Sequence, residues 1–254
     1  AYMAEIILEA EHLNKVFISH KKSFLAVEDA SFWMERGKCL GIVGESGSGK
    51  STVAKMVRGL LPGTHGSVKL FGEDITQKKG KALREIYREI QMVFQTPADS
   101  FDPRRTLGDG IGESLRNQRM SRTEVQKRVK ELLVTCGLPA DFSKRFPHEV
   151  SGGQCQRAAI ARALAVEPSV LVCDEATSAL DVTVQRQILD LLKELKQEKK
   201  ISFLFISHDL AVVQEFCDEV LVMYHGKIVE RGKTDQIICT PQMEYTKKLI
   251  DSVL

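Results

Sequence analysis

The sequence predicts a mixed α/β fold built around a parallel β-sheet. Three segments, residues 39–43, 170–174 and 202–206, are almost unbroken apolar runs, as in strands that are buried on both faces of a parallel sheet. Segments with helical periodicity lie between these runs, at residues 50–59 and 182–199. A glycine-rich loop joins the first run to the helix that follows it. Strands that alternate with helices in this way indicate α/β architecture.

The remaining elements are expected from shorter patterns. Further strand-like runs occur at residues 6–9, 16–19, 24–32, 68–71, 90–94, 220–224 and 227–230. The helix at 182–199 carries an apolar stripe with lysine and glutamate on the opposite face; the stripe consists of Val184, Ile188, Leu191, Leu192 and Leu195. A short helix is expected at 210–216.

The alternation stops between residues 96 and 165. Helical patterns at 107–119, 122–136 and 154–165 follow one another, and prolines separate them. The sequence therefore predicts a helical subdomain inserted into the sheet domain.

Composition limits the functional classes. The chain has 254 residues, 43% hydrophobic and 28% charged, which is typical of a soluble globular protein with one large domain. A net charge of +2 gives no reason to expect nucleic acid or an anionic membrane as a partner. The N-terminus lacks a signal-peptide pattern, and no run approaches the roughly 18 apolar residues of a membrane span. Any link to a membrane is therefore expected to run through a partner.

The cysteines carry no metal or redox pattern. All six are spread singly, without C-x-x-C spacing, and most lie inside apolar runs. We interpret them as small buried hydrophobes in a reducing cytosolic compartment.

The glycine-rich loop has the form G-x-x-x-x-G-K-[ST] of a phosphate-binding loop. Its glycines allow backbone N–H groups to converge on phosphate oxygens, and the following helix adds its positive N-terminal dipole. The lysine reaches the β- and γ-phosphates and the last serine suits Mg²⁺. An ordinary glycine-rich turn is the alternative, but the strand before the loop and the helix after it favour nucleotide binding. The loop consists of Gly44, Glu45, Ser46, Gly47, Ser48, Gly49, Lys50 and Ser51, with Thr52 directly after it.

Two acids end the buried strand at 170–174. Because ligands bind at the carboxyl edge of open α/β sheets, Asp174 and Glu175 are expected near the phosphates. Asp174 suits a role toward Mg²⁺ and Glu175 suits a general base that polarises the attacking water. Such a pair can also simply cap the next helix; its combination with the phosphate loop favours the catalytic interpretation.

His208 follows the third apolar strand. A lone histidine at a strand end is more often structural, but here the strand neighbours the other two in the predicted sheet. We therefore expect His208 to donate to the γ-phosphate. The next residue, Asp209, is expected to be the N-cap of the helix at 210–216.

A second glycine-rich turn opens a helix far from the first loop. It reads Val150-Ser151-Gly152-Gly153-Gln154, and a helix N-terminus with adjacent glycines is anion-binding architecture. Two phosphate-directed loops in one chain suggest a nucleotide held between two surfaces.

Together these motifs resemble the nucleotide-binding subunit of ABC transporters over nearly the whole chain. The resemblance implies a P-loop NTPase (RecA-like) core with an antiparallel β subdomain and an inserted α-helical subdomain. It makes residues 150–154 the family signature, with Val150 where leucine is usual, and 178–181 the D-loop ending in Asp181. Gln95 takes the place of the Q-loop glutamine, a ligand of Mg²⁺, and His208 that of the switch histidine. One departure is Ala176, where many members have proline.

The resemblance also implies ATP and Mg²⁺ as cofactors. Phe17 falls where the family places an aromatic ring against adenine; the alternative is a buried strand residue. Two such domains pair head-to-tail, so that Ser151, Gly152, Gly153 and Gln154 would contact ATP bound to the partner. The closing motion passes to membrane subunits through the groove near Gln95 and the helical subdomain.

Two stretches indicate the branch of peptide and nickel importers. Residues 100–104, Ser-Phe-Asp-Pro-Arg, and 240–249, Thr-Pro-Gln-Met-Glu-Tyr-Thr-Lys-Lys-Leu, resemble segments of that branch, with Met243-Glu244 replacing the usual His-Pro. The alternative for the second stretch is a generic amphipathic C-terminal helix. The phrase that begins at Asp181, Asp-Val-Thr-Val-Gln, favours the same branch. Peptides, nickel and metal chelates all remain as solutes.

These implications define the expected organisation. A single domain is expected, with a core at about 1–96 and 166–232, a helical subdomain at about 97–165 and a C-terminal tail at about 233–254. The expected partners are a second ABC ATPase (a heterodimer rather than a homodimer), two permease subunits and, indirectly, an external solute-binding protein, with no nucleic acid. The chain would lie at the cytoplasmic face of the inner membrane, held through the permeases.

Three alternative functions stay open. One is a soluble ABC ATPase that acts in cluster assembly, on ribosomes or on DNA; the sequence shows neither a second nucleotide domain nor a basic patch. Another is a subunit that binds ATP with little hydrolysis, against which Glu175 and His208 argue. The third is export, which the tail motif disfavours.

Overall fold

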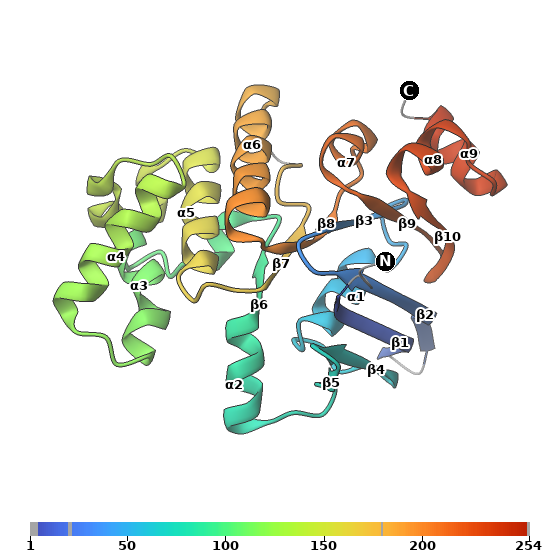
Figure 1. The fold of residues 1–254 in the computed structure, drawn as a ribbon, viewed down its shortest axis with the longest axis horizontal. Helices are drawn as coiled ribbons and strands as arrows, with labels where there is room; N and C mark the ends of the chain where they lie inside the picture. Colours follow the sequence, from blue (N-terminus) through green and yellow to red (C-terminus); the bar gives the residue numbers. More distant parts are fainter. Residues whose placement is uncertain (1–4, 20–21, 179, 253–254) are drawn as a thin grey trace.

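The chain forms two β-sheets and a separate group of helices (Figure 1). The computed structural model describes residues 5–19, 22–178 and 180–252. The larger sheet has six strands; in spatial order they are β10 (Lys227–Lys233), β9 (Glu219–Tyr224), β3 (Cys39–Val43), β8 (Ser202–Ile206), β7 (Val170–Asp174) and β6 (Ile90–Val93). The strands from β9 to β6 are parallel, and β10 pairs with β9 antiparallel. The parallel sheet that the sequence predicts is therefore confirmed.

Burial explains why the apolar runs were reliable signals. Every residue of β3, β7 and β8 is buried, because helices or the second sheet cover both faces. The bounds of these three strands are those expected from the sequence.

The second sheet is antiparallel and has four strands. In spatial order they are β2 (Lys22–Glu35), β1 (Ile6–Ser19), β4 (His65–Leu70) and β5 (Glu73–Asp74). The sequence predicted two short strands where β1 runs continuously. Register shifts on both sides of Leu13 and a left-handed backbone at His12 (φ 50°) interrupt the alternation there, so that one irregular strand reads as two.

Helix α1 (Lys50–Val57) lies between the two sheets. Its buried face, including Val53 and Val57, packs against residues of both sheets in one apolar cluster. The helix that follows the phosphate loop is thus fixed by the core on two sides.

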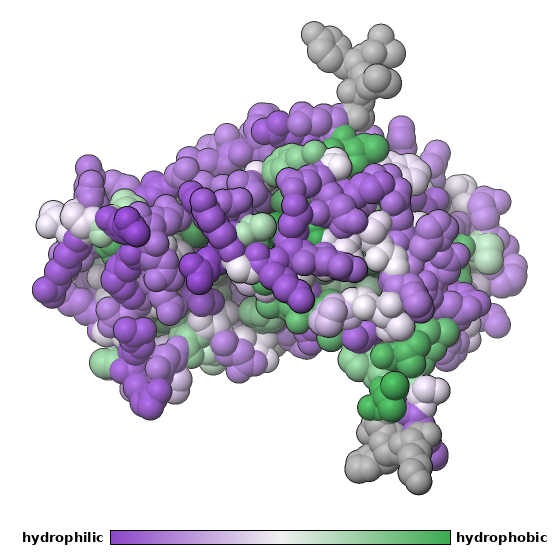
Figure 2. Space-filling view, turned by 90° about the horizontal axis from the view of Figure 1, so that it is seen from below, coloured by the Kyte–Doolittle hydropathy of each residue, from purple (hydrophilic) through white to green (hydrophobic). Residues whose placement is uncertain are grey.

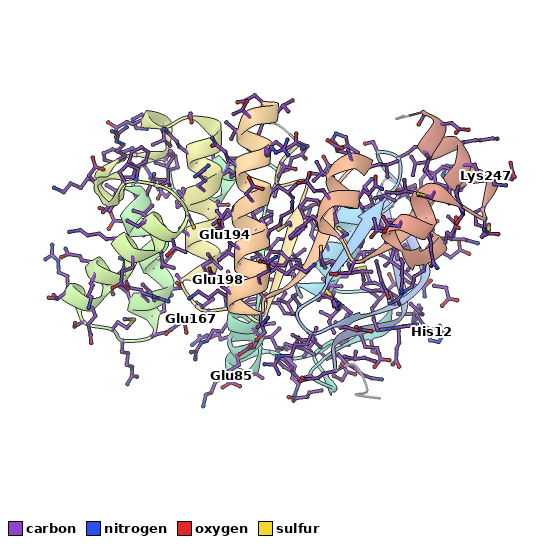
Figure 3. The ribbon with its side chains drawn as sticks, turned by 45° about the horizontal axis from the view of Figure 1, so that its top comes forward. His12, Glu85, Glu167, Glu194, Glu198 and Lys247 are labelled. Atoms are coloured by element: carbon purple, nitrogen blue, oxygen red, sulfur yellow. The ribbon has the colours of Figure 1, made fainter. Side chains whose placement is uncertain are left out.

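Helices cover the other face of the large sheet. Helix α6 (Val182–Lys199) buries Ile188, Leu191, Leu192 and Leu195 as expected, together with Leu189. Figure 3 shows Glu194 and Glu198 on its outer side, away from the sheet. Helix α7 (Leu210–Phe216) has the bounds expected from the sequence.

Between β6 and β7 every element is helical. These elements are η1 (Pro97–Ser100), α3 (Leu107–Asn117), α4 (Arg122–Thr135), η2 (Ala140–Lys144), η3 (Pro147–Glu149) and α5 (Gly152–Leu164). The three long helices agree with the expected ones to within two residues at each end. They form the group to the left in Figure 1, beyond α6.

Apart from the 3₁₀ turns, three of the described helices and strands were not predicted from the sequence. They are β5, α2 (Gly80–Glu89) and α8 (Thr234–Cys239). The amphipathic C-terminal helix that was kept as an alternative is present as α9 (Glu244–Asp251). Helix α2 buries only Ile86, and its short apolar stripe of Leu83, Ile86 and Tyr87 was overlooked among charged residues.

Five of the six cysteines are buried, and Cys239 is exposed. Burial raises the pKa of the Cys136 thiol to about 12 and that of Cys155 to about 11. These thiols are therefore neutral packing residues, as expected. Within the described residues, no helix is long and apolar enough to cross a membrane.

Candidate functional site

The phosphate loop joins the carboxyl end of β3 to α1. Gly44 is fully enclosed with φ 146°, and a Cβ there would lie 2.2 Å from the carbonyl oxygen of Met223, so only glycine fits. Gly49, with φ 104°, precedes α1 as its N-cap. The loop therefore places a helix N-terminus at the edge of the parallel sheet, where an anion is favoured.

Lys50 is folded back onto its own loop. Its Nζ donates to the carbonyl oxygens of Gly44 (2.8 Å) and Glu45 (2.7 Å). Burial lowers the pKa of Lys50, while the carboxylates of Glu175 and Asp174 act in the opposite direction. The ammonium group is thus held at the mouth of the loop, between backbone oxygens and acids.

Ser51 and Asp174 meet across the base of the site. The Ser51 hydroxyl donates to Asp174 Oδ1 at 2.7 Å. Burial raises the pKa of Asp174 above its ordinary value, and this hydrogen bond partly opposes the shift. The two side chains supply adjacent oxygen ligands of the kind that Mg²⁺ prefers.

A second cluster surrounds Glu175. Gln95 Nε2 donates to Glu175 Oε2 at 3.0 Å, and His208 Nδ1 lies 3.6 Å from the same oxygen. The Ser178 hydroxyl donates to the backbone oxygen of Glu175 at 3.0 Å. Glu175 has φ 50°, a left-handed backbone that is unusual for a side-chain-bearing residue and is often found at functional sites.

Both clusters open into one cleft of about 410 Å³. Its lining contains loop residues, the helix start and the acid cluster: Ser46, Gly47, Gly49, Lys50, Ser51, Thr52, Gln95 and Glu175. Phe17, Phe24 and Ala26 complete the lining from the β1–β2 hairpin. Within one chain, the structure therefore brings the first phosphate loop together with Gln95, Glu175 and Phe17.

The hairpin contributes exposed aromatic surface. Phe17 is 40% exposed and Phe24, directly opposite it in the β1–β2 ladder, is 62% exposed. Ile18 and Leu25 are also exposed, and Figure 2 shows hydrophobic surface at this end of the molecule. The alternative that Phe17 is a buried strand residue is wrong.

The signature residues lie at the start of α5 and do not line this cleft. Ser151 and Gln154 form a capping box: Ser151 Oγ accepts from the Gln154 N–H (3.3 Å) and Gln154 Oε1 accepts from the Ser151 N–H (2.9 Å). Gly153 also has a packing reason, since a Cβ there would lie 2.3 Å from Val184 Cγ1 of α6. Gly152 has open space, with Leu180 Cδ2 3.9 Å away.

Asp181 and Asp209 cap helices. Asp181 Oδ1 accepts from the Val184 N–H at 3.0 Å, and Asp209 Oδ1 accepts from the N–H groups of Ala211 and Val212. The cap role expected for Asp209 is confirmed. Ala179, in the middle of the expected D-loop, lies outside the described residues.

Sequence reasoning missed two residues of the site, Phe24 and Tyr245, and one contact of Ser178. Phe24 faces Phe17 because of the hairpin register, which requires a pairing that the sequence does not specify. Ser178 was expected only as the first residue of the D-loop, and its contact with Gln95 Nε2 (3.5 Å) was not foreseen. Tyr245 reaches the phosphate loop from α9 (Glu45 N to Tyr245 Oη, 3.1 Å), and the tail pattern gave no hint of that contact.

Comparison with known proteins identifies the family. The ABC transporter family model matches residues 27–178, more than half of the chain. The chain belongs to the ABC transporter ATPases. It is an ATP-binding protein of the type that couples ATP hydrolysis to transport.

Two curated relatives are similar over most of the chain. The oligopeptide transport ATP-binding protein OppF of Bacillus subtilis is 44% identical over 99% of this chain and 83% of its own length. OppF of Salmonella typhimurium is 46% identical over 91% of this chain and 70% of its own length.

Solved structures share the fold. The ATP-binding cassette MJ0796, a dimer bound to ADP and Pi in a post-hydrolysis state, has a TM-score of 0.83 at 29% identity and covers 90% of this chain and 99% of its own. CbiO1 of Clostridium perfringens has a TM-score of 0.82 at 28% identity, covering 98% and 94%. The antiparallel and helical subdomains expected of this fold are thus confirmed.

Proposed function

We propose that this chain hydrolyses ATP to power the import of peptides through partner permease subunits. The observation that carries the proposal is one cleft in which the phosphate loop meets Gln95 and Glu175, with the Ser51–Asp174 pair at its base. The relatives support the solute class, because their names refer to oligopeptides, to peptides and, for GsiA of Pectobacterium atrosepticum, to glutathione. None of these relatives supports the nickel or metal-chelate alternative.

ATP would bind with its phosphates on the loop and its base toward the hairpin. Backbone N–H groups of the loop and the N-terminus of α1 receive the phosphates, and Lys50 turns from its carbonyl partners toward the β- and γ-phosphates. Phe17 offers an aromatic face for adenine, and Phe24 lies beside it.

Ser51, Asp174 and Gln95 are the oxygen donors that would hold Mg²⁺. No group of three or more His, Cys, Asp or Glu forms a metal site in the described part of the chain. This fits Mg²⁺, which usually binds through one or two carboxylates together with substrate phosphates. Bound there, the ion would neutralise charge that develops on the phosphates.

Glu175 would act as the general base. Its Oε2 is held by Gln95 and faces His208, so the carboxylate is oriented and keeps Oε1 for a water molecule. His208 would donate to the γ-phosphate. Its position beside Glu175 Oε2 keeps it close to the proposed general base.

The signature would act on a partner's nucleotide. Ser151, Gly152, Gly153 and Gln154 form an open helix N-terminus outside this chain's own cleft, and Asp181 begins the neighbouring helix α6. Support comes from MJ0796, which is described as a dimer, and from CbiO1, which is described as part of a transporter complex. We propose head-to-tail pairing with a second ABC ATPase, different from this chain.

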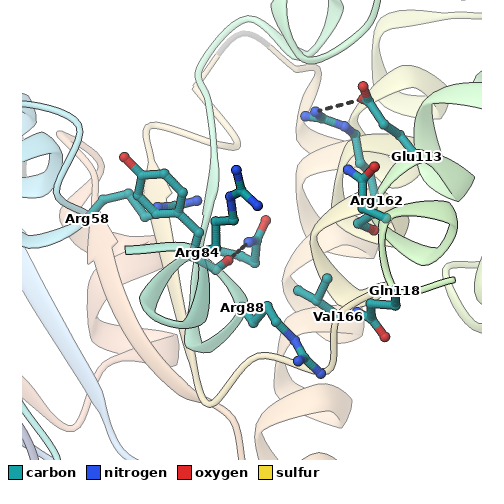
Figure 4. A pocket seen from close by; sticks show the side chains of 11 residues that line it. Arg58, Arg84, Arg88, Glu113, Gln118, Arg162 and Val166 are labelled. Atoms are coloured by element: carbon teal, nitrogen blue, oxygen red, sulfur yellow. Dashed lines mark hydrogen bonds and ion pairs between the residues drawn. The ribbon is translucent and has the colours of Figure 1, made fainter. Parts of the chain in front are cut away.

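An arginine-lined cleft offers a contact for the permease. It measures about 700 Å³ and lies between α2 on one side and α3 and α5 on the other (Figure 4). Its lining includes Arg58, Arg84, Arg88 and Arg162, with Glu113 as its acid. Because Arg162 lies 3.8 Å from Glu113 and Arg58 is buried, the exposed Arg84 and Arg88 remain for an acidic segment of a partner.

Arg58 is the buried member of this group. Its guanidinium stacks on Tyr87 at 4.0 Å, and its Nε and Nη1 are buried with no hydrogen-bond partner in the described residues. Burial lowers the pKa of Arg58 to about 10, so the charge persists at neutral pH. We propose that permease subunits dock here, which holds the chain at the cytoplasmic face of the membrane.

The proposed division of the chain follows from these contacts. The core at about 1–96 and 166–232 carries the phosphate loop and the acids, and the helical subdomain at about 97–165 carries the signature. The tail is proposed at about 233–254, and its described part packs on the core through Ile237 and Ile250.

The test is recovery of the tagged chain from detergent-solubilised membranes of its source, followed by assay of the recovered complex. We expect two permease subunits and a second ABC ATPase, with ATP hydrolysis that rises when a peptide-loaded binding protein is added. Recovery of ribosomes, DNA-bound proteins or cluster-assembly factors would contradict transport. Stimulation by nickel complexes and not by peptides would contradict the solute class.

A further inference from the structure

Helix α9 is anchored to the core more firmly than a free tail. It buries Thr246 and Ile250. The Glu230 carboxylate of β10 accepts hydrogen bonds from the backbone N–H groups of Gln242 (2.8 Å) and Met243 (3.2 Å), just before the helix begins. Lys247 lies on the outer side, as Figure 3 shows, and pairs with Glu244. This anchoring fixes the face of α9 that points inward.

Tyr245 lies on that inward face and reaches the phosphate loop. Its ring packs against Tyr224, the last residue of β9, with centroids 4.1 Å apart and planes tilted by 33°. Its hydroxyl oxygen accepts a hydrogen bond from the backbone N–H of Glu45 at 3.1 Å. Burial raises the pKa of Tyr245, so the hydroxyl is neutral at physiological pH.

The Tyr245 hydroxyl oxygen binds the peptide unit that joins Gly44 to Glu45. The N–H of Glu45 and the carbonyl of Gly44 belong to the same planar group, and that carbonyl accepts from Lys50 Nζ at 2.8 Å. Tyr245 therefore fixes the plane whose opposite end holds the lysine.

The adjoining β9–β10 turn supports the same loop independently. Gly226 N–H donates to the Ser48 carbonyl at 3.0 Å, and the carbonyl of Met223 packs against Gly44. The Gly44–Glu45 peptide itself donates its N–H to the side chain of Tyr245.

We propose that Tyr245 is a positioning residue for ATP binding, which holds the Gly44–Glu45 peptide so that Lys50 Nζ rests at the mouth of the loop, from where it can turn to the phosphates. The proposal rests on the proposed role of Lys50. Phenylalanine at this position keeps the ring contact with Tyr224 but removes the acceptor. The peptide unit is then free to rotate in the absence of ATP. Ordering it when ATP binds costs free energy, which lowers the affinity for ATP.

The experiment compares ATP affinity in Tyr245→Phe and Tyr224→Phe. Tyr224 is the matched control, because it contributes the other ring of the pair and its hydroxyl makes no hydrogen bond to any described residue. We expect Tyr245→Phe to raise the ATP dissociation constant about threefold to tenfold, the usual range for one hydrogen bond. Tyr224→Phe should stay within twofold of the wild type.

A second comparison separates positioning from general stability. Combined with Lys50→Ala, Tyr245→Phe should change ATP affinity by less than twofold, since the group that it positions is absent. Equal fold-changes in both backgrounds would show a merely structural role and overturn the proposal, as would wild-type affinity in Tyr245→Phe. If the wild-type chain itself bound no ATP, the proposed function would fail and not this assignment alone.

Discussion

At the residue scale, the site is made by side chains that are distant in sequence and adjacent in space. Ser51 and Asp174 are separated by 123 positions and meet at 2.7 Å. Motif spacing predicted the identity of both residues, because the loop and the acid pair each follow a buried strand. It did not predict Tyr245, whose contact depends on where a tail helix packs.

Asp174 gives a pH prediction. Its raised pKa means that the folded state holds a proton at pH values where the unfolded chain has released it, so stability is lost as pH rises through the folded-state pKa. Asp174→Asn keeps an acceptor for Ser51 without the buried charge. We expect the nucleotide-free variant to melt a few degrees above the wild type at pH 7, with the difference vanishing below about pH 4.

Thermal unfolding without nucleotide or Mg²⁺ measures this difference. Asp190→Asn, on the exposed side of α6, is the matched control and should melt like the wild type at both pH values. A destabilised Asp174→Asn at pH 7, or a difference that does not depend on pH, would contradict the burial argument.

At the element scale, the sequence predicted buried strands best. A strand that is covered on both faces leaves a continuous apolar run, so the bounds of β3, β7 and β8 were right. Helix α2 and strand β5 were missed because they lie at the surface and bury little. The break in β1 at His12 was invisible for another reason, since a left-handed non-glycine residue leaves no compositional signal.

Gly153 gives a prediction about how α5 packs on α6. In Gly153→Ala the new Cβ would meet Val184, a β-branched residue with little freedom to move within a helix. We expect the free energy of unfolding to fall by about 1–3 kcal/mol, as for other overpacked sites. Gly152→Ala, one residue earlier with open space around it, should change it by less than about 0.5 kcal/mol.

Denaturant unfolding of both variants makes this comparison. Equal stability of the two would mean that α5 is free to shift away from α6 at no cost. Gly153 would then be explained by nucleotide contact alone.

At the scale of the whole molecule, two surfaces remain for partners. The signature lies outside the chain's own cleft, and the arginine-lined cleft lies between α2 and the helical group. The signature was expected from the sequence, but the cleft was not, because its arginines come from the end of α1, from α2 and from α5. The family resemblance predicted that a groove exists but not which side chains line it.

The arginine-lined cleft gives a prediction about assembly. Arg84→Glu combined with Arg88→Glu should reduce recovery of permease subunits at least tenfold, because an acidic segment would then face like charges. ATP binding by the chain should be unchanged, since these side chains do not line the nucleotide cleft.

Lys127→Glu with Lys130→Glu, on exposed positions of α4, is the charge-matched control. Wild-type permease recovery with the arginine variant, or equal loss with the lysine variant, would exclude this cleft as the docking surface.

The most direct test of the account is ATP turnover by Glu175→Gln. Glutamine keeps the shape and the hydrogen bond with Gln95 but lacks the basic oxygen. We expect ATP affinity within about twofold of the wild type, turnover reduced at least about 100-fold, and a closed dimer trapped with the partner ATPase. Glu194→Gln, on the outer face of α6, should retain full turnover. Normal hydrolysis by purified Glu175→Gln, free of contaminating ATPases, would contradict the assignment of Glu175 as the base on which the proposed mechanism depends.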